Sequence, residues 1–240
     1  MVKVLILGSA PYAVAAADWD RGAFDYIVAI NNAWRIRPDW SHMIHPEDFP
    51  QDRRPVLLES GQTVVTAEDY VPAQNIYGGF VYAGGTMAFT AGYWALAALQ
   101  PTHLCYFGCD MVYPQNGKTH FYGTGTADPL RDDVTLANLE AKARRLEVFA
   151  GLQGCATVNL SPHRSVLPYQ RANPGDLDQI RPTRIAPQAA QAVRLREQEL
   201  GYFVPSGRYW EHRERFSPAA IAEVDAAWLG CFSPEVAAVA

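Results

Sequence analysis

Asp110, Lys118 and His120 lie close together in the sequence, and their side chains suit group-transfer chemistry. Asp110 comes just after the apolar run 103–107, where we expect a strand to end. A histidine can take a proton from a hydroxyl near neutral pH, and a lysine can stabilise the charge of a departing phosphate. The segment therefore predicts a catalytic loop at a strand end, although an exposed loop histidine without a chemical role is the alternative for His120.

Two carboxylates, Asp132 and Asp133, end the same loop, which runs from about 113 to 133 without clear periodicity. A loop of that length is more typical of a functional segment than of a simple connection. Either carboxylate could serve as the general base. Both also suit the first turn of the helix that we expect next, where negative charge is favourable. The sequence leaves these two roles open.

Small and amide residues follow apolar segments elsewhere and are candidates to line a nucleotide site. They are Gly8, Ser9, Ala10 and Pro11 after the first segment, Asn31 and Asn32 after the second, and Gly84, Gly85 and Thr86 at the start of a third. Glycines let a backbone approach a ligand closely. The chain has neither G-x-G-x-x-G nor a Walker lysine motif here, which disfavours ordinary dinucleotide or P-loop chemistry. As the simpler alternatives, these residues end strands or cap a helix.

Apolar runs separated by turn residues predict a β-α-β start and a doubly wound α/β fold. Strands are expected at 3–7, 25–30, 40–44, 62–66, 103–107 and 155–160, and helices at 12–19, 84–99, 136–152, 188–200 and after 217. The charged residues assigned to the solvent face of the helix 136–152 are Glu140, Lys142, Arg144, Arg145 and Glu147. The candidate nucleotide residues follow strands or open turns, where ligands bind in open α/β sheets.

The expected fold is a Rossmann-like domain over residues 1–168 with a doubly wound, mostly parallel sheet, followed by a helical appendage or lid over 169–240. A length of 240 residues with 49% apolar and 19% charged residues fits a globular domain. A net charge of −5 disfavours nucleic acid as a partner. The apolar start is too short for a signal peptide or a membrane span, so we expect a cytoplasmic protein without a transmembrane segment.

Histidines and cysteines do not predict a metal site. The four cysteines lack C-x-x-C spacing and suit a core. His42, His45, Glu47 and Asp48 cluster in sequence, but a strand end followed by a helical turn explains them better, and His45 is expected to line the pocket and contact substrate. Lys118, Arg131 and Arg164 are basic residues near the expected phosphate, although each alone is equally typical of a solvated surface.

Five of these segments, taken in order, resemble those of a known group of transferases. They are 5–11, Ile30-Asn31-Asn32, Gly84-Gly85-Thr86, 107–113 with Gly117-Lys118-Thr119-His120, and Arg145-Leu146-Glu147-Val148-Phe149 through Ser161-Pro162. The group joins the small bacterial sialyltransferases to a family that includes archaeal hydroxymethyl-dihydropterin diphosphokinases. The resemblance covers about residues 2–168 and implies a GT-A-like variant of the Rossmann-like fold.

The resemblance also implies roles for individual residues. Gly8 to Pro11 would approach the nucleotide, Asn31 with its neighbour Asn32 would hydrogen-bond it, and Gly84, Gly85 and Thr86 would line the same pocket. Asp110 and Tyr113 would lie near the nucleotide and donor, and Ser161 near the phosphate. The histidine base of the sialyltransferases has no counterpart, because its expected place falls near Ala137 and no histidine lies between His120 and His163. His120 is the nearest replacement in chemical type.

Three functions remain open at this point. We favour a metal-independent glycosyltransferase that needs no cofactor and joins a nucleotide-activated sugar to a small-molecule or glycan acceptor. The alternative is a diphosphokinase that uses ATP and magnesium, with Asp110 or Asp128 as the metal carboxylate. The third is a non-catalytic nucleotide-binding or assembly protein. The aromatic residues of the C-terminal segment could form a lid, a homo-oligomer surface or an acceptor-binding face, and they are Tyr202, Phe203, Tyr209 and Trp210.

Overall fold

The computed structural model of the protein describes residues 1–114, 116–124 and 131–232. Its centre is a seven-stranded sheet in which every strand pair is parallel, in the order β4-β3-β2-β1-β5-β6-β7. The strands are β1 Lys3–Leu7, β2 Tyr26–Ile30, β3 His42–Ile44, β4 Thr63–Val65, β5 His103–Phe107, β6 Ala156–Asn159 and β7 Gln170–Arg171. The Rossmann-like α/β fold expected from the sequence is confirmed.

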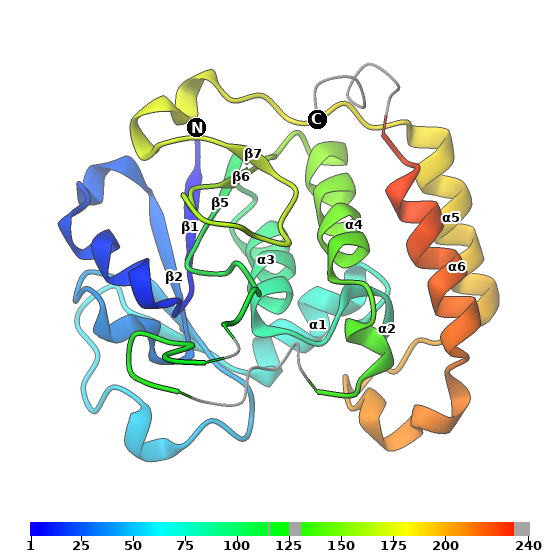
Figure 1. Ribbon diagram of the computed structural model, residues 1–240, viewed down its shortest axis with the longest axis horizontal. Coiled ribbons are helices and arrows are strands. Elements are labelled where there is room, and N and C mark those ends of the chain that lie inside the picture. Colours follow the sequence, from blue (N-terminus) through cyan, green and yellow to red (C-terminus); the bar gives the residue numbers. More distant parts are fainter. Residues whose placement is uncertain (115, 125–130, 233–240) are drawn as a thin grey trace.

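The strand order reverses beside β1, which lies at the middle of the sheet. From β1 the chain moves outward through β2, β3 and β4, and it then returns to the other side of β1 with β5. The gap between the carboxyl ends of β1 and β5 is therefore the topological switch point, where open α/β sheets bind ligands. In Figure 1 this end of the sheet faces down, where the loops after β3 and β5 gather.

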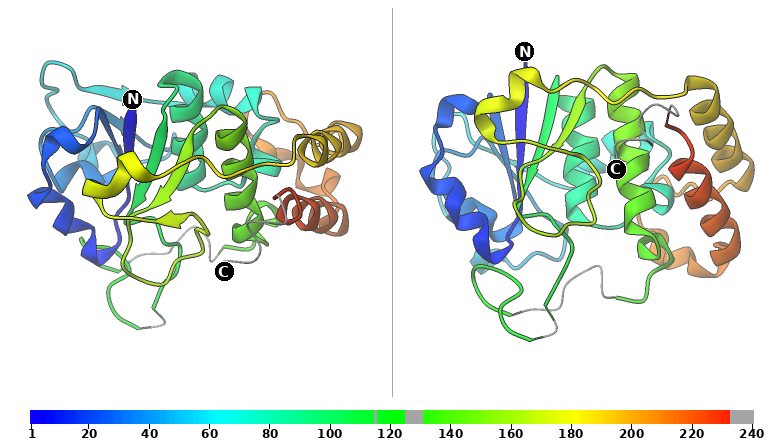
Figure 2. Two further views of the ribbon diagram at one scale, coloured as in Figure 1. Left: turned by 90° about the horizontal axis from the view of Figure 1, so that it is seen from above. Right: turned by 45° about the horizontal axis from the view of Figure 1, so that its top comes forward.

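Alternate side chains of β1 enter two different hydrophobic cores. Val4 and Ile6 pack among the α-helices, whereas Leu5 and Leu7 pack beneath short 3-10 helices. This alternation follows from the twofold period of a strand, and the wholly apolar sequence of β1 reflects burial on both faces. Figures 1 and 2 show the unequal cover: short helices on one face, and α3 and α4 on the other with α5 and α6 stacked beyond them.

The helices agree with the expected ones in part. The α-helices are α1 Ala67–Ile76, α2 Phe80–Ala83, α3 Met87–Ala98, α4 Leu139–Leu152, α5 Pro187–Leu200 and α6 Pro218–Leu229. α1 was missed, because it contains Pro72 and has little amphipathic periodicity. The expected helix 12–19 is a 3-10 helix, Pro11–Asp18, and the expected helix 84–99 begins only at Met87, since Gly84 has a positive φ of 89°.

The solvent face assigned to α4 is wrong for three of its five residues. Lys142, Arg145 and Glu147 are buried, while Glu140 is exposed and Arg144 is half-buried. α5 and α6 cover this side of α4 and supply carboxylates for Lys142 and Arg145, whereas Glu147 binds Arg144 and Thr183. The segment after residue 168 therefore packs tightly on the helical layer, and its first residues also add β7 to the sheet.

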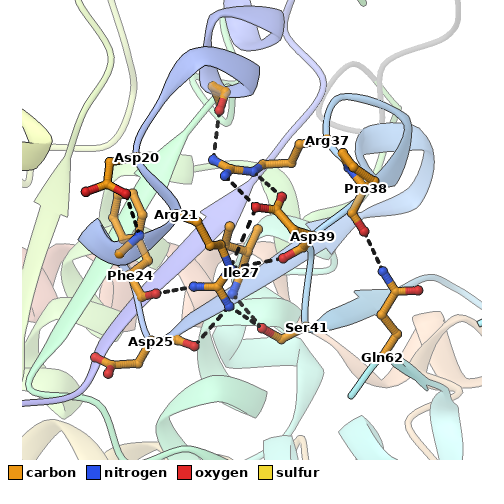
Figure 3. A network of polar contacts seen from close by, with 12 residues as sticks. Asp20, Arg21, Phe24, Asp25, Ile27, Arg37, Pro38, Asp39, Ser41 and Gln62 are labelled. Carbon is orange, nitrogen blue, oxygen red and sulfur yellow. Dashed lines mark hydrogen bonds and ion pairs between the residues drawn. The ribbon is translucent and has the colours of Figure 1, made fainter. Parts of the chain in front are cut away.

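Two arginines organise the 3-10 face of the sheet. Arg37 donates from Nη1 to the carbonyl of Ala16 at 2.9 Å and binds the carboxylate of Asp39 through Nε and Nη2 at 2.6 and 2.8 Å. Arg21 donates to the carbonyl of Asp39 and to Ser41, which begins the path into β3. Figure 3 shows both guanidinium groups turned toward Asp39, whose pKa is lowered mainly by the Arg37 hydrogen bonds.

No helix within residues 1–114, 116–124 and 131–232 combines the length and the apolar character needed to cross a membrane.

Candidate functional site

A cleft of about 600 Å³ opens at the switch point, and we call it the central cleft. Its floor comes from the turns that follow β1, β2 and β5, and the first residues of α3 close one side. The lining residues are Gly8, Ser9, Ile30, Asn31, Asn32, Arg35, Arg53, Thr86, Met87, Ala88, Gly108, Cys109, Met111, Tyr113, His120, Tyr122 and Thr124. Segments expected from the sequence to form a nucleotide site are thus brought together here.

Gly8 and Gly108 make the floor possible because their backbones touch. The amide of Gly8 donates to the carbonyl of Phe107 at 2.8 Å, and the amide of Ala10 donates to the carbonyl of Gly108 at 3.1 Å. A β-carbon on Gly8 would collide with that carbonyl, and Gly108 has a φ of 75°, which only glycine adopts without strain. Since these amides are occupied and Pro11 has none, the turn gives close approach and no cradle of N–H groups.

A second cleft of about 520 Å³, the side cleft, adjoins the first. Its own wall includes Ala10, Pro11, Tyr12, Asp110, His163 and Arg164. The residues that line both clefts are Ser9, Gly108, Cys109, Met111, Tyr113 and His120. The two clefts therefore form one continuous depression, large enough together for a nucleotide and a group attached to it.

His120 lies on the shared wall and is held there from several sides. Its Nδ1 is 2.8 Å from the hydroxyl of Thr119, and its ring stacks on Tyr122 with centroids 5.0 Å apart. Next to it, the amide of Phe121 donates to the carbonyl of Ser9 at 3.0 Å, which ties the loop to the turn after β1. The long loop after β5 thus presents its histidine to the switch point, as a catalytic loop would.

Asp110 is anchored by a cluster that joins the ends of three distant segments. Its Oδ2 accepts hydrogen bonds from the hydroxyls of Tyr12 and Ser161, the latter at 3.0 Å, and the two hydroxyl oxygens lie 2.8 Å apart. Burial, and then the bond to Asp110, raises the pKa of Tyr12 well above its ordinary value, so the phenol stays protonated. Oδ1 of Asp110 is buried and has no hydrogen-bond partner within the described residues. A ligand in the side cleft could donate to it.

The central cleft is lined by positively charged groups near the start of α3. Thr86 caps this helix by accepting from the amide of Phe89 at 3.3 Å, and Met87 and Ala88 begin it beside the cleft. The N-terminus of a helix carries unpaired N–H groups and a partial positive charge, which favour an anion. Two exposed arginines, Arg35 and Arg53, line the same cleft. Together these groups suit a phosphate.

Residues with a strained backbone and side-chain amides without hydrogen-bond partners also line the central cleft. Only three described residues other than glycine have a positive φ, and two of them, Asn31 at 53° and Met111 at 52°, line the central cleft. Such conformations cost about 1–3 kcal/mol each and cluster at functional sites. The side-chain oxygens of Asn31 and Asn32 are buried and have no partner within the described chain. They are oriented acceptors for a ligand with hydroxyl or amine donors.

The chain matches no protein-family model, no curated protein and no solved structure. The family resemblance of its motifs therefore stays a prediction. Of the site residues expected from the sequence, those on the walls of the two clefts are Gly8, Ser9, Ala10, Pro11, Asn31, Asn32, Thr86, Asp110, Tyr113, His120 and Arg164. Ser161 lies directly behind them through Asp110.

Other expected residues lie away from both clefts. Gly84 packs against Lys142. His45 stacks on Phe49, and its Nδ1 is hydrogen-bonded to the carbonyl of Pro46. Lys118 and Asp132 are exposed and line neither cleft. Asp128 lies outside the described residues. Within the described chain, no group of three or more histidine, cysteine, aspartate or glutamate side chains could hold a metal ion.

The carboxylate of Asp133, a candidate base, is held by four hydrogen bonds. It accepts from the amide and hydroxyl of Thr135, from Arg131 and from the hydroxyl of Tyr209 at 2.7–3.0 Å. Burial raises the pKa of Asp133, but these hydrogen bonds outweigh burial and the net pKa is lowered. Arg131 also donates to the carbonyl of Gly85 at 2.8 Å. Asp133, Arg131 and Gly85 therefore belong to one hydrogen-bonded cluster outside the two clefts.

Three contributors to the clefts carried no sequence signal. Arg35 and Arg53 come from short 3-10 helices after β2 and β3, and isolated arginines there are ordinary surface residues. Tyr12 meets Asp110 across 98 positions of sequence. Only the sheet order, which places β1 beside β5, brings these residues into contact with the expected site.

Proposed function

We propose that the protein is a glycosyltransferase that uses a nucleotide-activated sugar. The observation that carries this proposal is the position of His120 on the wall shared by two clefts at the switch point. The nucleoside would occupy the side cleft, between the turn 8–11 and Asp110, and the phosphate and sugar would occupy the central cleft. A hydroxyl of the acceptor would then meet the sugar beside an imidazole.

The phosphate would bind at the start of α3, between Arg35 and Arg53. This placement follows from charge, because the central cleft combines two arginines with a helix N-terminus. When the sugar leaves, negative charge grows on the phosphate oxygen that was bonded to it. Fixed positive groups at that point stabilise the transition state more than the ground state.

His120 would act as the general base. The hydroxyl of Thr119 lies 2.8 Å from Nδ1 and helps to orient the ring, which would take the proton of the acceptor hydroxyl. The acceptor oxygen forms a bond to the anomeric carbon, the bond from that carbon to the phosphate oxygen breaks, and the nucleotide departs. The products are the glycosylated acceptor, the nucleotide and a protonated imidazole, which returns its proton to solvent.

A second candidate is an ATP- and magnesium-dependent diphosphokinase. One observation favours it: Oδ1 of Asp110 is a buried carboxylate oxygen without a partner in the described chain, and carboxylate oxygens are preferred magnesium ligands. Among the described residues, Asp110 is the one carboxylate on the walls of these two clefts. This function would require magnesium for nucleotide binding, whereas the glycosyltransferase would not.

Thermal unfolding with nucleotides tests the proposed site. Cytidine, uridine, guanosine and adenosine mono-, di- and triphosphates are each added with and without magnesium. We expect a pyrimidine or guanosine mono- or diphosphate to raise Tm without magnesium, because a ligand that binds only the folded state stabilises it. The double variant Arg35→Ala, Arg53→Ala should lose most of that shift, and Lys118→Ala, which removes an exposed lysine that lines neither cleft, should keep it.

Other outcomes of the screen decide among the functions. A shift with ATP that appears only with magnesium would favour the diphosphokinase. A shift without turnover of any nucleotide sugar would favour a non-catalytic nucleotide-binding protein. No shift with any nucleotide would contradict all three.

His120→Asn tests the general base. We expect kcat to fall by about 10²–10⁴-fold, the usual contribution of general-base catalysis, while the nucleotide Tm shift is kept. Asparagine keeps a polar side chain on the shared wall, so a merely structural role for His120 would leave kcat nearly unchanged. Thr119→Val, which removes the hydroxyl next to Nδ1, should lower kcat by a smaller factor and serves as the graded comparison.

A further inference from the structure

A third cleft of about 450 Å³ lies on the other side of the start of α3, and we call it the aromatic cleft. It shares Thr86 and Met87 with the central cleft. These are the residues at which α3 begins, where the proposed function puts the phosphate. A molecule in the aromatic cleft would therefore lie next to the place proposed for the phosphate, to which the reacting carbon of a nucleotide sugar is bonded.

The wall of the aromatic cleft is held in place by the cluster around Asp133. The hydroxyl of Tyr209 donates to Asp133 at 2.7 Å, and Arg131 donates to that hydroxyl at 2.9 Å and to the carbonyl of Gly85 at 2.8 Å. A β-carbon on Gly85 would collide with the hydroxyl of Tyr209. The C-terminal segment is thus fitted against the start of α3 and completes a wall that residues 1–168 alone do not supply.

The side chains that face this cleft include aromatic rings and charges of both signs, the cations being Arg131 and Arg213. Trp210 is next to the anchored Tyr209 and is 48% exposed, and Tyr70 contributes a second aromatic ring. Glu47 and Asp48 are exposed carboxylates on the same cleft. An aromatic ring packs on the apolar face of a sugar, and carboxylates accept hydrogen bonds from its hydroxyls. Burial, with the charges of Glu47 and Asp48, raises the pKa of Tyr70 to about 12.

We propose that the aromatic cleft binds the acceptor, and that this acceptor is a saccharide stacked on Trp210. The inference rests on the proposed function, since it defines the acceptor as the partner of a nucleotide-sugar donor. The charged side chains also differ between the two clefts: the aromatic cleft carries both signs, with Glu47 and Asp48 beside Arg213, whereas the central cleft is lined by the arginines Arg35 and Arg53, which attract a phosphate. The acceptor hydroxyl enters the central cleft past Thr86 and Met87.

Saturation-transfer NMR with methyl glycosides tests this assignment. Methyl β-galactoside, methyl β-glucoside, methyl α-mannoside and methyl β-N-acetylglucosaminide are added to the full chain, with the stabilising nucleotide present. We expect at least one glycoside to bind, and Trp210→Ala to weaken it by about tenfold, the size of one aromatic stacking contact. Phe203→Ala removes a comparably exposed aromatic side chain that does not line this cleft, and it should leave glycoside binding unchanged.

A second variant separates recognition from folding. Glu47→Gln keeps the size of an exposed side chain, so the fold is retained, and loss of charge should weaken the glycoside by a smaller factor than Trp210→Ala. Both variants should keep the nucleotide Tm shift.

Each remaining outcome contradicts a different statement. No glycoside binding to the wild type, or binding that neither variant weakens, overturns the acceptor site and leaves the nucleotide shift as separate support for the proposed function. Loss of the nucleotide shift in Trp210→Ala would also overturn it, because the cleft would then hold the nucleotide. If a glycoside depends on Trp210 but no nucleotide stabilises the wild type, the saccharide site stands and the proposed function fails.

Discussion

Two regions of the molecule differ in the hydrogen-bond partners of their buried polar side chains. In the helical layer, Arg145 of α4 is wholly buried and binds Glu197 of α5 through Nε and Nη2 at 2.8 Å, while Nη1 donates to the hydroxyl of Tyr93. Trp228 of α6 donates to the same glutamate at 2.8 Å. At the switch point, by contrast, the side-chain oxygens of Asn31, Asn32 and Asp110 are buried without partners in the described chain.

The difference supports the proposal of a ligand site at the switch point. An unpaired buried polar group costs about 1–3 kcal/mol, so a cluster of them persists only where it has a use. The buried cations of the helical layer, Lys142 and Arg145, are paired with carboxylates of the C-terminal helices, although Oδ2 of Asp225 and the side-chain amide of Gln74 have no hydrogen-bond partner in the described chain. In the clefts, amide and carboxylate oxygens lack hydrogen-bond partners within the described chain, and the backbones of Asn31 and Met111 are strained by a positive φ. This arrangement suits a ligand.

The largest expected effect comes from breaking a pair in the helical layer. Lys142 of α4 lies 2.7 Å from Asp225 of α6, and both side chains are almost fully buried. Burial lowers the pKa of Lys142 and raises the pKa of Asp225, which shows how costly their charges are there. Lys142→Met leaves a buried carboxylate unpaired and should lower the free energy of unfolding by about 3–5 kcal/mol in urea titration.

The double variant Lys142→Met, Asp225→Leu is the matched control for this loss. Replacing a whole buried ion pair by apolar side chains is often neutral, so the double variant should regain most of the lost stability. The nucleotide Tm shift should survive in it, because the pair lies outside the clefts. A double variant as unstable as the single one would show that packing, rather than the unpaired charge, sets the loss.

Much of the fold could be predicted because parallel strands are wholly apolar and end at turn residues. The segments 3–7 and 103–107 agree with β1 and β5 to the residue. What failed depends on contacts between distant segments. Charged residues on α4 were placed in solvent because the pattern of one helix cannot show that α5 and α6 cover it, and the two-residue strand β7 is too short to have a pattern.

The second effect is expected at Asn31, where stability and binding should respond separately. Asn31→Gly removes the unpaired amide and suits the φ of 53°, so the free energy of unfolding should stay within about 1 kcal/mol of the wild type. Affinity for the nucleotide-activated sugar should fall by about tenfold, as expected for one lost hydrogen bond from a hydroxyl of the sugar, which the proposal places in the central cleft. Isothermal titration with a sugar derivative of the stabilising nucleotide measures this affinity.

Gln100→Gly is the control for Asn31→Gly. Gln100 has a φ of 47°, and it follows α3 at the end remote from the central cleft. Glycine should be tolerated there equally well, with affinity for the nucleotide-activated sugar unchanged. If Asn31→Gly also binds the nucleotide-activated sugar like the wild type, the unpaired amide is not a ligand contact and the comparison between the two regions loses its main support.

Site residues could be predicted where they directly follow an apolar strand pattern. They could not be predicted where contacts between distant segments bring them to the site. Asn31, Asp110 and the turn after β1 follow apolar runs, and the sheet brings them to one edge. Arg35 and Arg53 follow no pattern, and the anion site appears only when α3 is seen to begin beside them. Gly85 was expected at the nucleotide, but the hydroxyl of Tyr209 occupies its open face, a contact across more than a hundred residues.

Asp133 gives the smallest effect and shows whether its hydrogen-bonded cluster belongs with the paired region. Its folded pKa is lowered, since hydrogen bonds from Thr135, Tyr209 and Arg131 outweigh burial, so its contribution to stability is present above the unfolded pKa and disappears as pH falls through the folded one. The difference in unfolding free energy between wild type and Asp133→Asn should therefore be constant from pH 7 to 5 and shrink below about pH 4. Asp132→Asn, at an exposed neighbour, should change stability little at any of these pH values. If the difference in unfolding free energy stays constant down to pH 2.5, the charge of the Asp133 carboxylate contributes nothing to stability. Asp133 would then resemble the unpaired groups of the clefts.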